Sequence, residues 1–334
     1  MFDRLSPGSE TTDRVARGRE IQRRTGSTFH VATRLLPERV RDPTYVLYGF
    51  FRVADEVVDG DGPDAPAAQR ERLEEIRAAA LGKRAATDPV VGAFAEVRET
   101  HGIDPADVHA FVDAMQVDTR RDRYETYEDL AAYMDGSAAA VGRMMTALMD
   151  PEDPEAALPH ATALGEAFQL TNFLRDVRED AEGLGRVYLP LETLDAHDAS
   201  AEDVLACRPT AGVRAAVADE LARAEARYRT GVAGIRHLPE DCQFAVLLAA
   251  VLYAGYHRPI RDRNGDVFTD PPGLTRRRVV SLVARTRLRW AVSEDPAAVF
   301  AAVTGIDRST DAPARPVAPF GDADAAGNPR FPDS

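Results

Sequence analysis

Two stretches of the chain carry oxygen-bearing side chains at helical spacing. In the first, Asp55 and Asp59 are four residues apart, so on a helix both carboxylates leave the same face, which Arg52 shares. In the second, spacings of three and four residues bring onto one stripe the side chains of Gln169, Asn172, Asp176 and Asp180. Apolar residues around both stretches predict buried helices, where carboxylates need a cation as partner.

Hard oxygen ligands on two facing helices suit Mg²⁺, which keeps some waters and takes its remaining ligands from phosphate, and Mn²⁺ is an expected substitute. The predicted metal ligands are Asp55, Asp59, Asn172, Asp176 and Asp180. We expect the guanidinium groups of Arg52, Arg175 and Arg186 to hold phosphate oxygens. This donor set is suited to ionising an allylic diphosphate, because the leaving group needs positive charge and the carbocation needs a dry cavity.

The elements that must position these residues are helices. Long segments carry Ala, Leu, Arg and Glu at helical spacing, and no convincing alternating strand is present, which predicts an all-α fold. The predicted helices span residues 67–81, 105–117, 127–149, 159–182, 212–236, 241–261 and 274–289. We expect one helical domain over residues 19–305, an N-terminal extension over 1–18, and a disordered acidic, proline-rich tail over 306–334.

Composition restricts the partners. Against 55 acidic residues stand 41 basic ones, giving a net charge of −14, and Lys83 is the only lysine, so nucleic-acid binding is not expected. Such a surface suits high salt, although a GC-rich genome alone would also favour arginine over lysine.

The run Arg276-Arg277-Arg278 could attract a diphosphate or lipid headgroups, but its acidic surroundings favour a solvated helix start. We find no signal peptide or membrane-spanning segment and expect a cytoplasmic protein, with peripheral membrane contact for product release left open.

The two stretches and their flanks closely resemble the signature regions of the squalene and phytoene synthase family. The matching residues are Tyr48, Arg52, Asp55-Glu-Val-Val-Asp59, the run from Gln169 to Asp180, and Gly185-Arg186-Val-Tyr188-Leu-Pro190. The resemblance extends from about Arg19 to Arg289 and is greatest to microbial members of the haloarchaeal type. It implies a single-domain, all-α isoprenoid-synthase fold with a central cavity, and Mg²⁺-dependent head-to-head coupling of two prenyl diphosphates.

Carried over position by position, the family's metal motifs fall on the five ligands named above. Catalytic roles are implied for Asp55, Asp59, Asp176, Asp180, Arg52 and Tyr188. Substrate-contacting positions fall on Thr25, Gly26, Ser27, Thr28, Tyr48, Arg52, Tyr133, Gln169, Arg175, Arg186 and Tyr253. One departure is Asp135, which stands where the family usually has the second ring of a Tyr-Cys-Tyr sequence.

The expected reaction condenses two geranylgeranyl diphosphates, through a cyclopropylcarbinyl diphosphate, to phytoene, the first committed step of carotenoid biosynthesis. The nearest alternative is a squalene or dehydrosqualene synthase acting on two farnesyl diphosphates, with NADPH needed for squalene. A prenyl hydrolase or terpene cyclase explains the long second motif less well, and an inactive helical scaffold protein would not need intact metal motifs. The sequence does not indicate the general base or the oligomeric state.

Overall fold

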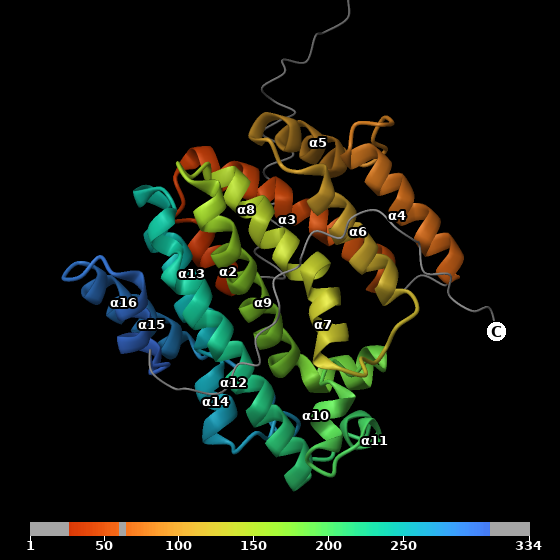
Figure 1. The fold of residues 1–334 in the computed structure, drawn as a ribbon, viewed down its shortest axis with the longest axis vertical. Helices are drawn as coiled ribbons and strands as arrows, with labels where there is room; N and C mark the ends of the chain where they lie inside the picture. The colour runs from red at the N-terminus through yellow and green to blue at the C-terminus, as the bar shows by residue number, and fades with distance from the viewer. Residues whose placement is uncertain (1–26, 60–64, 308–334) are drawn as a thin grey trace, which may run out of the picture.

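The computed structural model describes residues 27–59 and 65–307, which form a bundle of helices (Figure 1). No β-strand occurs within these ranges, where the one isolated bridge pairs Arg123 with Val187. The predicted all-α class is therefore confirmed. The predicted extension over residues 1–18, and the tail beyond residue 307, lie outside the described residues.

The helices follow one another in this order: α2 (Ser27–Thr33), α3 (Glu38–Asp59), α4 (Pro66–Ala80), α5 (Pro89–His101), α6 (Pro105–Asp118), α7 (Tyr127–Met134), the π-helical turn η1 (Asp135–Ala139), α8 (Ala140–Met149), α9 (Pro154–Glu179), the π-helical turn η2 (Asp180–Leu184), α10 (Leu191–Asp195), α11 (Ala201–Leu205), α12 (Ala211–Ala233), the 3₁₀ turn η3 (Ile235–His237), α13 (Glu240–Ala254), α14 (His257–Asp262), α15 (Arg276–Trp290) and α16 (Pro296–Thr304). Helices α5 and α16 were not among those that periodicity predicts.

Two predicted helix boundaries are wrong for local reasons. Helix α9 begins at Pro154 rather than Pro159, because the Asp153 carboxylate caps it by accepting the Ala156 N–H at 3.0 Å. The helix predicted over 241–261 ends at Ala254 and resumes at His257. At the break, a Cβ on Gly255 would lie 2.9 Å from Leu282 Cδ1, so a glycine lets α15 approach closely.

Helix α9 lies in the middle of the bundle, with α12 and α13 on one side and α7 and α8 on the other (Figure 1). Helix α3 is anchored from its N-terminal half: Tyr45, Leu47 and Phe50 are fully buried, and Phe50 stacks on Phe94 at 3.9 Å. The prediction that this aromatic run is buried is confirmed. Burial of one side of α3 fixes the direction of the polar residues at its C-terminal end.

Glycines bring η1, α8 and α9 into backbone contact. A Cβ on Gly142 would lie 2.5 Å from the Ala161 carbonyl oxygen, and one on Gly165 would lie 2.5 Å from the Ala138 carbonyl oxygen. The small-residue run that the sequence places at residues 136–142 is thus a close-packed seam, and its first residues form the π-helical turn η1. Because backbone meets backbone there, the helices cannot move closer together.

No helix in the described ranges is both long enough and apolar enough to cross a lipid bilayer.

Candidate active site

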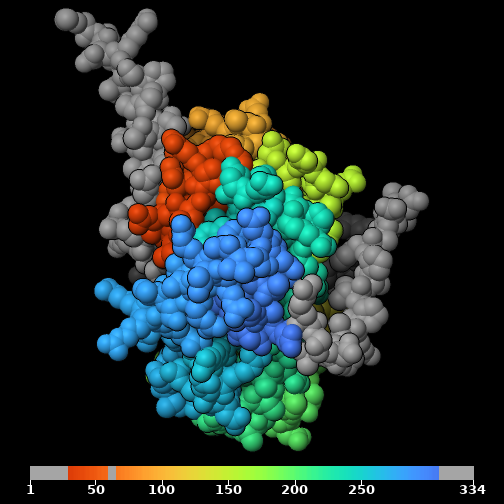
Figure 2. All heavy atoms as spheres, turned by 90° about the vertical axis from the view of Figure 1, so that its left-hand side faces the viewer, coloured from red at the N-terminus to blue at the C-terminus, as the bar shows by residue number. Residues whose placement is uncertain are grey.

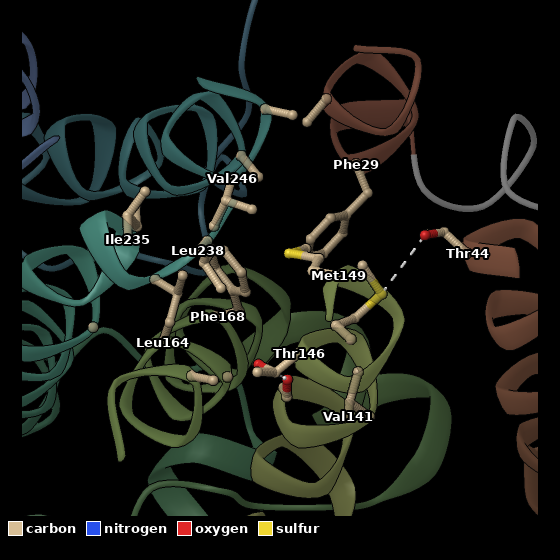
Figure 3. A pocket seen from close by; sticks show the side chains of 18 of the residues that line it. Phe29, Thr44, Val141, Thr146, Met149, Leu164, Phe168, Ile235, Leu238 and Val246 are labelled. Atoms are coloured by element: carbon tan, nitrogen blue, oxygen red, sulfur yellow. Dashed lines mark hydrogen bonds between the residues drawn. The ribbon is translucent and has the colours of Figure 1, made fainter. Parts of the chain in front are cut away.

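An apolar cavity of about 260 Å³ lies between α2, α3, α8, α9 and α13. Figure 3 shows Phe29, Met149, Leu164 and Phe168 gathered around the same space. Along α9, the lining residues run from Phe168 back to Ala157, a distance of about 16 Å at 1.5 Å per residue. The predicted central cavity is therefore present and is elongated along α9.

Arg39 ties together three segments at the Met149 end of this cavity. Its guanidinium donates to the Met149 carbonyl at 3.2 Å and pairs with the Asp241 carboxylate at 2.6 Å. These contacts join the start of α3 to the end of α8 and the start of α13. The opposite end of the cavity is lined by Tyr48 and Phe168, next to the polar residues of α3 and α9.

On α3, Arg52 and Asp55 follow Tyr48 by one and two helical turns. Arg52 Nη1 lies 3.7 Å from Asp55 Oδ2, and its Nε lies 3.9 Å from Glu56 Oε1. The Asp55 side chain is 36 % exposed, so the expectation of a buried carboxylate is wrong. Asp59 is the last residue of α3, and only its backbone is described.

On α9, the predicted polar stripe is present at its expected spacing. Asn172 Nδ2 donates weakly to Gln169 Oε1 at 3.4 Å. The Asn172 Oδ1 atom is buried and has no hydrogen-bond partner within the described part of the chain. Asp176 follows one turn later, and Asp180 begins the π-helical turn η2. A buried amide oxygen that accepts no hydrogen bond fits a metal ligand, because burial without a partner is costly.

The side chains that are described do not gather into a group of three or more carboxylate, histidine or cysteine ligands. Asp59 belongs to the predicted ligand set, and its side chain is not among those described. The predicted ligands whose side chains are described, Asp55, Asn172, Asp176 and Asp180, carry hard oxygen donors on α3, on α9 and at the start of η2. Their chemistry fits Mg²⁺ or Mn²⁺ and does not fit a soft metal.

Arg175 holds the Asp176 carboxylate in a two-bond pair, with Nε to Oδ1 at 2.7 Å and Nη2 to Oδ2 at 2.5 Å. Burial alone would lower the pKa of Arg175, but the hydrogen bonds and charge of Asp176 outweigh it and raise that pKa. The guanidinium also lies 5.3 Å from the centre of the Tyr256 ring. Arg175 therefore stays charged beside Asp176 on the polar stripe of α9.

Tyr253 connects α13 to this end of the cavity. Its ring centre lies 4.4 Å from that of Phe29 and 5.0 Å from that of Phe168. Burial raises the pKa of Tyr253, and the nearby Arg175, which hydrogen-bonds its hydroxyl, only partly offsets this. The side chain therefore packs a neutral ring against Phe29 and Phe168, which line the cavity, and directs its hydroxyl to Arg175.

A second aromatic cluster surrounds Asp118, at the C-terminal end of α6. The Tyr133 hydroxyl donates to Asp118 Oδ2 at 2.8 Å. The Tyr188 ring stacks on Phe173 of α9 at 4.1 Å, and Tyr124 lies 5.3 Å from Tyr133 and 5.9 Å from Tyr188. Burial, followed by the charge of Asp118, raises the pKa of all three tyrosines, so each remains neutral.

A sharp chain reversal brings Arg186 and Tyr188 to this cluster. After η2, Gly185 adopts a left-handed conformation at φ 66°, and the Arg186 N–H donates to the Asp180 carbonyl at 3.0 Å. The Arg186 side chain is buried and donates to the Asp118 carbonyl at 3.0 Å and to the Tyr188 hydroxyl at 3.5 Å. Arg186 thus joins Tyr188 to the end of α6 within the cluster. The sequence predicted only a contact between Arg186 and phosphate.

A buried polar network supports α9 from behind the stripe. Thr171 lies beside Asn172 in the sequence, and its Oγ1 is 3.0 Å from the Tyr228 hydroxyl and 2.9 Å from His257 Nε2. His257 Nδ1 lies 3.2 Å from Glu225 Oε1, and Glu225 also pairs with Arg261. Burial lowers the pKa of His257 more than Glu225 raises it, so the ring is neutral.

The remaining predicted residues have the following places. Ser27 and Thr28 begin α2 and are described as backbone only, whereas Thr25 and Gly26 lie outside the described residues. Asp135, which replaces the second tyrosine of the family's Tyr-Cys-Tyr sequence, forms an ion pair with Arg143 at 2.9 Å. The Asp135 side chain is therefore part of a contact at the surface. Sequence reasoning matched Asp118 and Tyr124 to the family's pattern without naming a role for them, and it gave Phe173 a packing role only.

Comparison with known proteins agrees with this geometry. The family model of squalene/phytoene synthases matches residues 22–284. A phytoene synthase of Rhodobacter capsulatus is 36 % identical over 272 residues, which cover 79 % of this chain and 78 % of the relative. A phytoene synthase of Cereibacter sphaeroides is 38 % identical over 284 residues, covering 81 % and 78 % of the two chains.

Solved structures show the same architecture. The crystal structure of a dehydrosqualene synthase in complex with a ligand superposes with a TM-score of 0.77 at 26 % identity, over 86 % of this chain and 100 % of that one. A squalene synthase from Alicyclobacillus acidocaldarius gives a TM-score of 0.68 at 28 % identity, over 77 % and 96 %. The likeness to a haloarchaeal type remains a prediction. From its residues, its fold and these relatives, this chain belongs to the squalene/phytoene synthase family of prenyltransferases.

Proposed function

We propose that this enzyme condenses two molecules of geranylgeranyl diphosphate head to head, through a cyclopropylcarbinyl diphosphate, to phytoene. The observation that carries the proposal is an elongated apolar cavity that begins beside two polar helix faces. A substrate with a charged diphosphate and a long hydrocarbon tail matches both parts. Each methylene of the tail that leaves water contributes roughly 0.8 kcal/mol to binding.

The polar end would bind the diphosphates. Asp55, Asp59, Asn172, Asp176 and Asp180 would hold Mg²⁺, with Mn²⁺ as a substitute, and the metal would supply positive charge to the departing diphosphate. Arg52 shares its charge between Asp55 and Glu56. In this proposal the Arg52 guanidinium would hold phosphate oxygens once the carboxylates take up the cation.

The aromatic residues would stabilise the carbocations. Tyr133, Tyr188 and Phe173 present ring faces close together, and the raised pKa of both tyrosines keeps their hydroxyls protonated. Neutral rings attract a cation through their faces and do not react with it as phenolates would. We assign these rings to stabilisation, and we assign the general base to none of them.

Phytoene formation and squalene formation differ in their last step. In the first half-reaction, one substrate loses its diphosphate, and C1 of the resulting prenyl carbocation bonds to the double bond of the second substrate. A proton is lost as the cyclopropane ring closes. In the second half, the other diphosphate leaves, the ring rearranges, and loss of a second proton gives a conjugated central triene. Squalene formation replaces that last proton loss by hydride addition, and therefore needs NADPH.

Dehydrosqualene or squalene synthesis from two farnesyl diphosphates is the second candidate. It is favoured by the superposition on a dehydrosqualene synthase and on a squalene synthase, each above 25 % identity. Several relatives that are named phytoene synthases are more similar to this chain than those two structures are, at 33 to 38 % identity. We therefore rank the longer substrate first.

The test is to incubate the purified protein with each diphosphate and Mg²⁺, with and without NADPH, and to identify the hydrocarbon by mass spectrometry. We expect phytoene from geranylgeranyl diphosphate without NADPH. Squalene that appears only with NADPH would overturn the proposal, and dehydrosqualene as the main product would establish the second candidate.

A further inference from the structure

Helix α15 differs in charge from the rest of the molecule. It carries six arginines and no acidic residue in its 15 positions, although the whole chain has a net charge of −14. The arginines are Arg276, Arg277, Arg278, Arg285, Arg287 and Arg289. The acidic groups closest in sequence to its C-terminal end are Glu294 and Asp295, and Asp295 is occupied in capping α16. An anionic surface would therefore meet attraction at this helix and repulsion over most of the remaining molecule.

The outer face of α15 also exposes apolar side chains. Among the described residues, the three most exposed large hydrophobic side chains are Val280 at 67 %, Leu288 at 70 % and Val292 at 84 %. Val280, Ala284, Leu288 and Val292 are spaced by four residues, so they follow one stripe of the helix and of the turn after it. On a helical projection, arginines lie on both sides of that stripe.

The inner face holds the helix firmly in the fold. Leu282 and Thr286 are buried, and Trp290 lies 6.1 Å from Phe244 of α13. Helices α15 and α16 form the part of the molecule that faces the viewer in Figure 2. The outer stripe therefore belongs to a helix that is packed on the rest of the fold.

A small pocket of about 140 Å³ beside this face gathers more positive charge. It is lined by Arg258 and Arg261 of α14 and by Arg278 and Arg285 of α15. The Arg278 Nε atom is buried without a hydrogen-bond partner in ranges 27–59 and 65–307. Burial lowers the pKa of Arg278, and repulsion from Arg258 and Arg285 adds to this, although Asp262 opposes it. An anionic group in the pocket would relieve the repulsion.

We propose that the outer face of α15, together with the pocket lined by Arg278, docks the enzyme on an anionic lipid bilayer. Phosphate headgroups would pair with the arginines, and Val280, Leu288 and Val292 would enter the interface, as in amphipathic helices that lie on membranes. The docking replaces our interpretation of the arginine run as a solvated helix start. Its use, delivery of a C40 hydrocarbon into the membrane, rests on the proposed function, but the binding itself does not.

The test is co-sedimentation of the full chain, without substrate, with vesicles of phosphatidylglycerol and phosphatidylcholine, and with vesicles of phosphatidylcholine alone. We expect binding to the anionic vesicles only, weakening as salt is raised. Each arginine at such a surface changes partitioning by about fivefold, so the triple variant R276Q/R277Q/R287Q should bind on the order of a hundredfold more weakly.

A matched control removes three arginines elsewhere, R70Q/R72Q/R236Q, and should bind as the wild type does. The variant V280S/L288S keeps every charge and should bind the anionic vesicles more weakly than the wild type while its binding still depends on salt. Equal binding by the α15 triple variant with unchanged helicity would overturn the proposal. So would equal binding to uncharged vesicles, or gel filtration showing that the same face joins two copies of the chain. Failure of phytoene synthesis alone would leave the vesicle result unaffected.

Discussion

The end of the cavity near Ala157 and Met149 makes substrate length a testable property of one side chain. Ala157 lies on the first turns of α9 and lines the cavity, about 16 Å along the helix from Phe168. Replacing Ala157 by phenylalanine would place a ring in the last helical turn of the cavity. We expect this to shorten the available space by about one turn, or roughly 5 Å, and to exclude the last isoprene unit of a geranylgeranyl chain.

The size of the change in substrate preference follows from the number of carbons that are no longer buried. An isoprene unit has five carbons, and at roughly 0.8 kcal/mol each the longer substrate loses about 4 kcal/mol relative to the shorter one. Since about 1.4 kcal/mol is tenfold, preference for geranylgeranyl over farnesyl diphosphate should fall by several hundredfold. The added ring also strains the packing by about 1–3 kcal/mol, which should lower the unfolding temperature without unfolding the protein.

The assay is competition between the two diphosphates, with both hydrocarbon products counted by mass spectrometry. Ala157→Ser is the control, because it adds one atom and should leave the preference unchanged. If Ala157→Phe folds and still uses both substrates in the wild-type ratio, the tail does not run along α9 to Met149. The arrangement of substrate that we propose would then be refuted.

Four further predictions address the site and the fold. Asp55→Asn and Asp176→Asn should each lower turnover by about a hundredfold or more with circular dichroism unchanged, and retained turnover would remove both from the metal site. Tyr133→Phe should cost about 1–3 kcal/mol in chemical unfolding because Asp118 loses its donor, yet still form product, and loss of product would assign a role to the hydroxyl. His257 has a folded pKa below its ordinary 6.5, so its contribution to stability is present above pH 6.5 and is lost as pH falls; His257→Gln should flatten that loss in thermal melts. Raising KCl should raise the unfolding temperature, because salt shortens the range of repulsion on a chain of net charge −14, and the opposite trend would contradict a salt-adapted surface.

The sequence predicted most of the long helices and the spacing of both polar stripes, because each depends on residues close together in the chain. The spacing from Gln169 to Asp176 and the aromatic run before Asp55 are local patterns, and the structure contains both. The start of α9 was misplaced because the cap at Asp153 starts the helix, and Pro159, six residues later, does not end it. The exposure of Asp55 could not be predicted, because it depends on what packs above the end of α3.

The aromatic cluster was harder to foresee because it joins segments far apart in the sequence. Tyr133 meets Asp118 through the packing of α7 on α6, and Tyr188 arrives only after the reversal at Gly185. An aspartate at the end of a helix has no local signal that distinguishes it from a solvated one. Phe173 shares α9 with the polar stripe, and its apolar type alone suggested core packing.

The glycine seam has a consequence for the stability of the enzyme. An apolar cavity of about 260 Å³ forgoes the packing energy that side chains would contribute there, until a hydrocarbon fills it. Side chains would normally move inward to recover part of this energy, but backbone contacts at Gly142 and Gly165 hold the walls of α8 and α9 apart. The fold thus gives up stability in order to keep a prenyl chamber open, and the supply of isoprenoid substrate becomes a determinant of how long the folded enzyme survives.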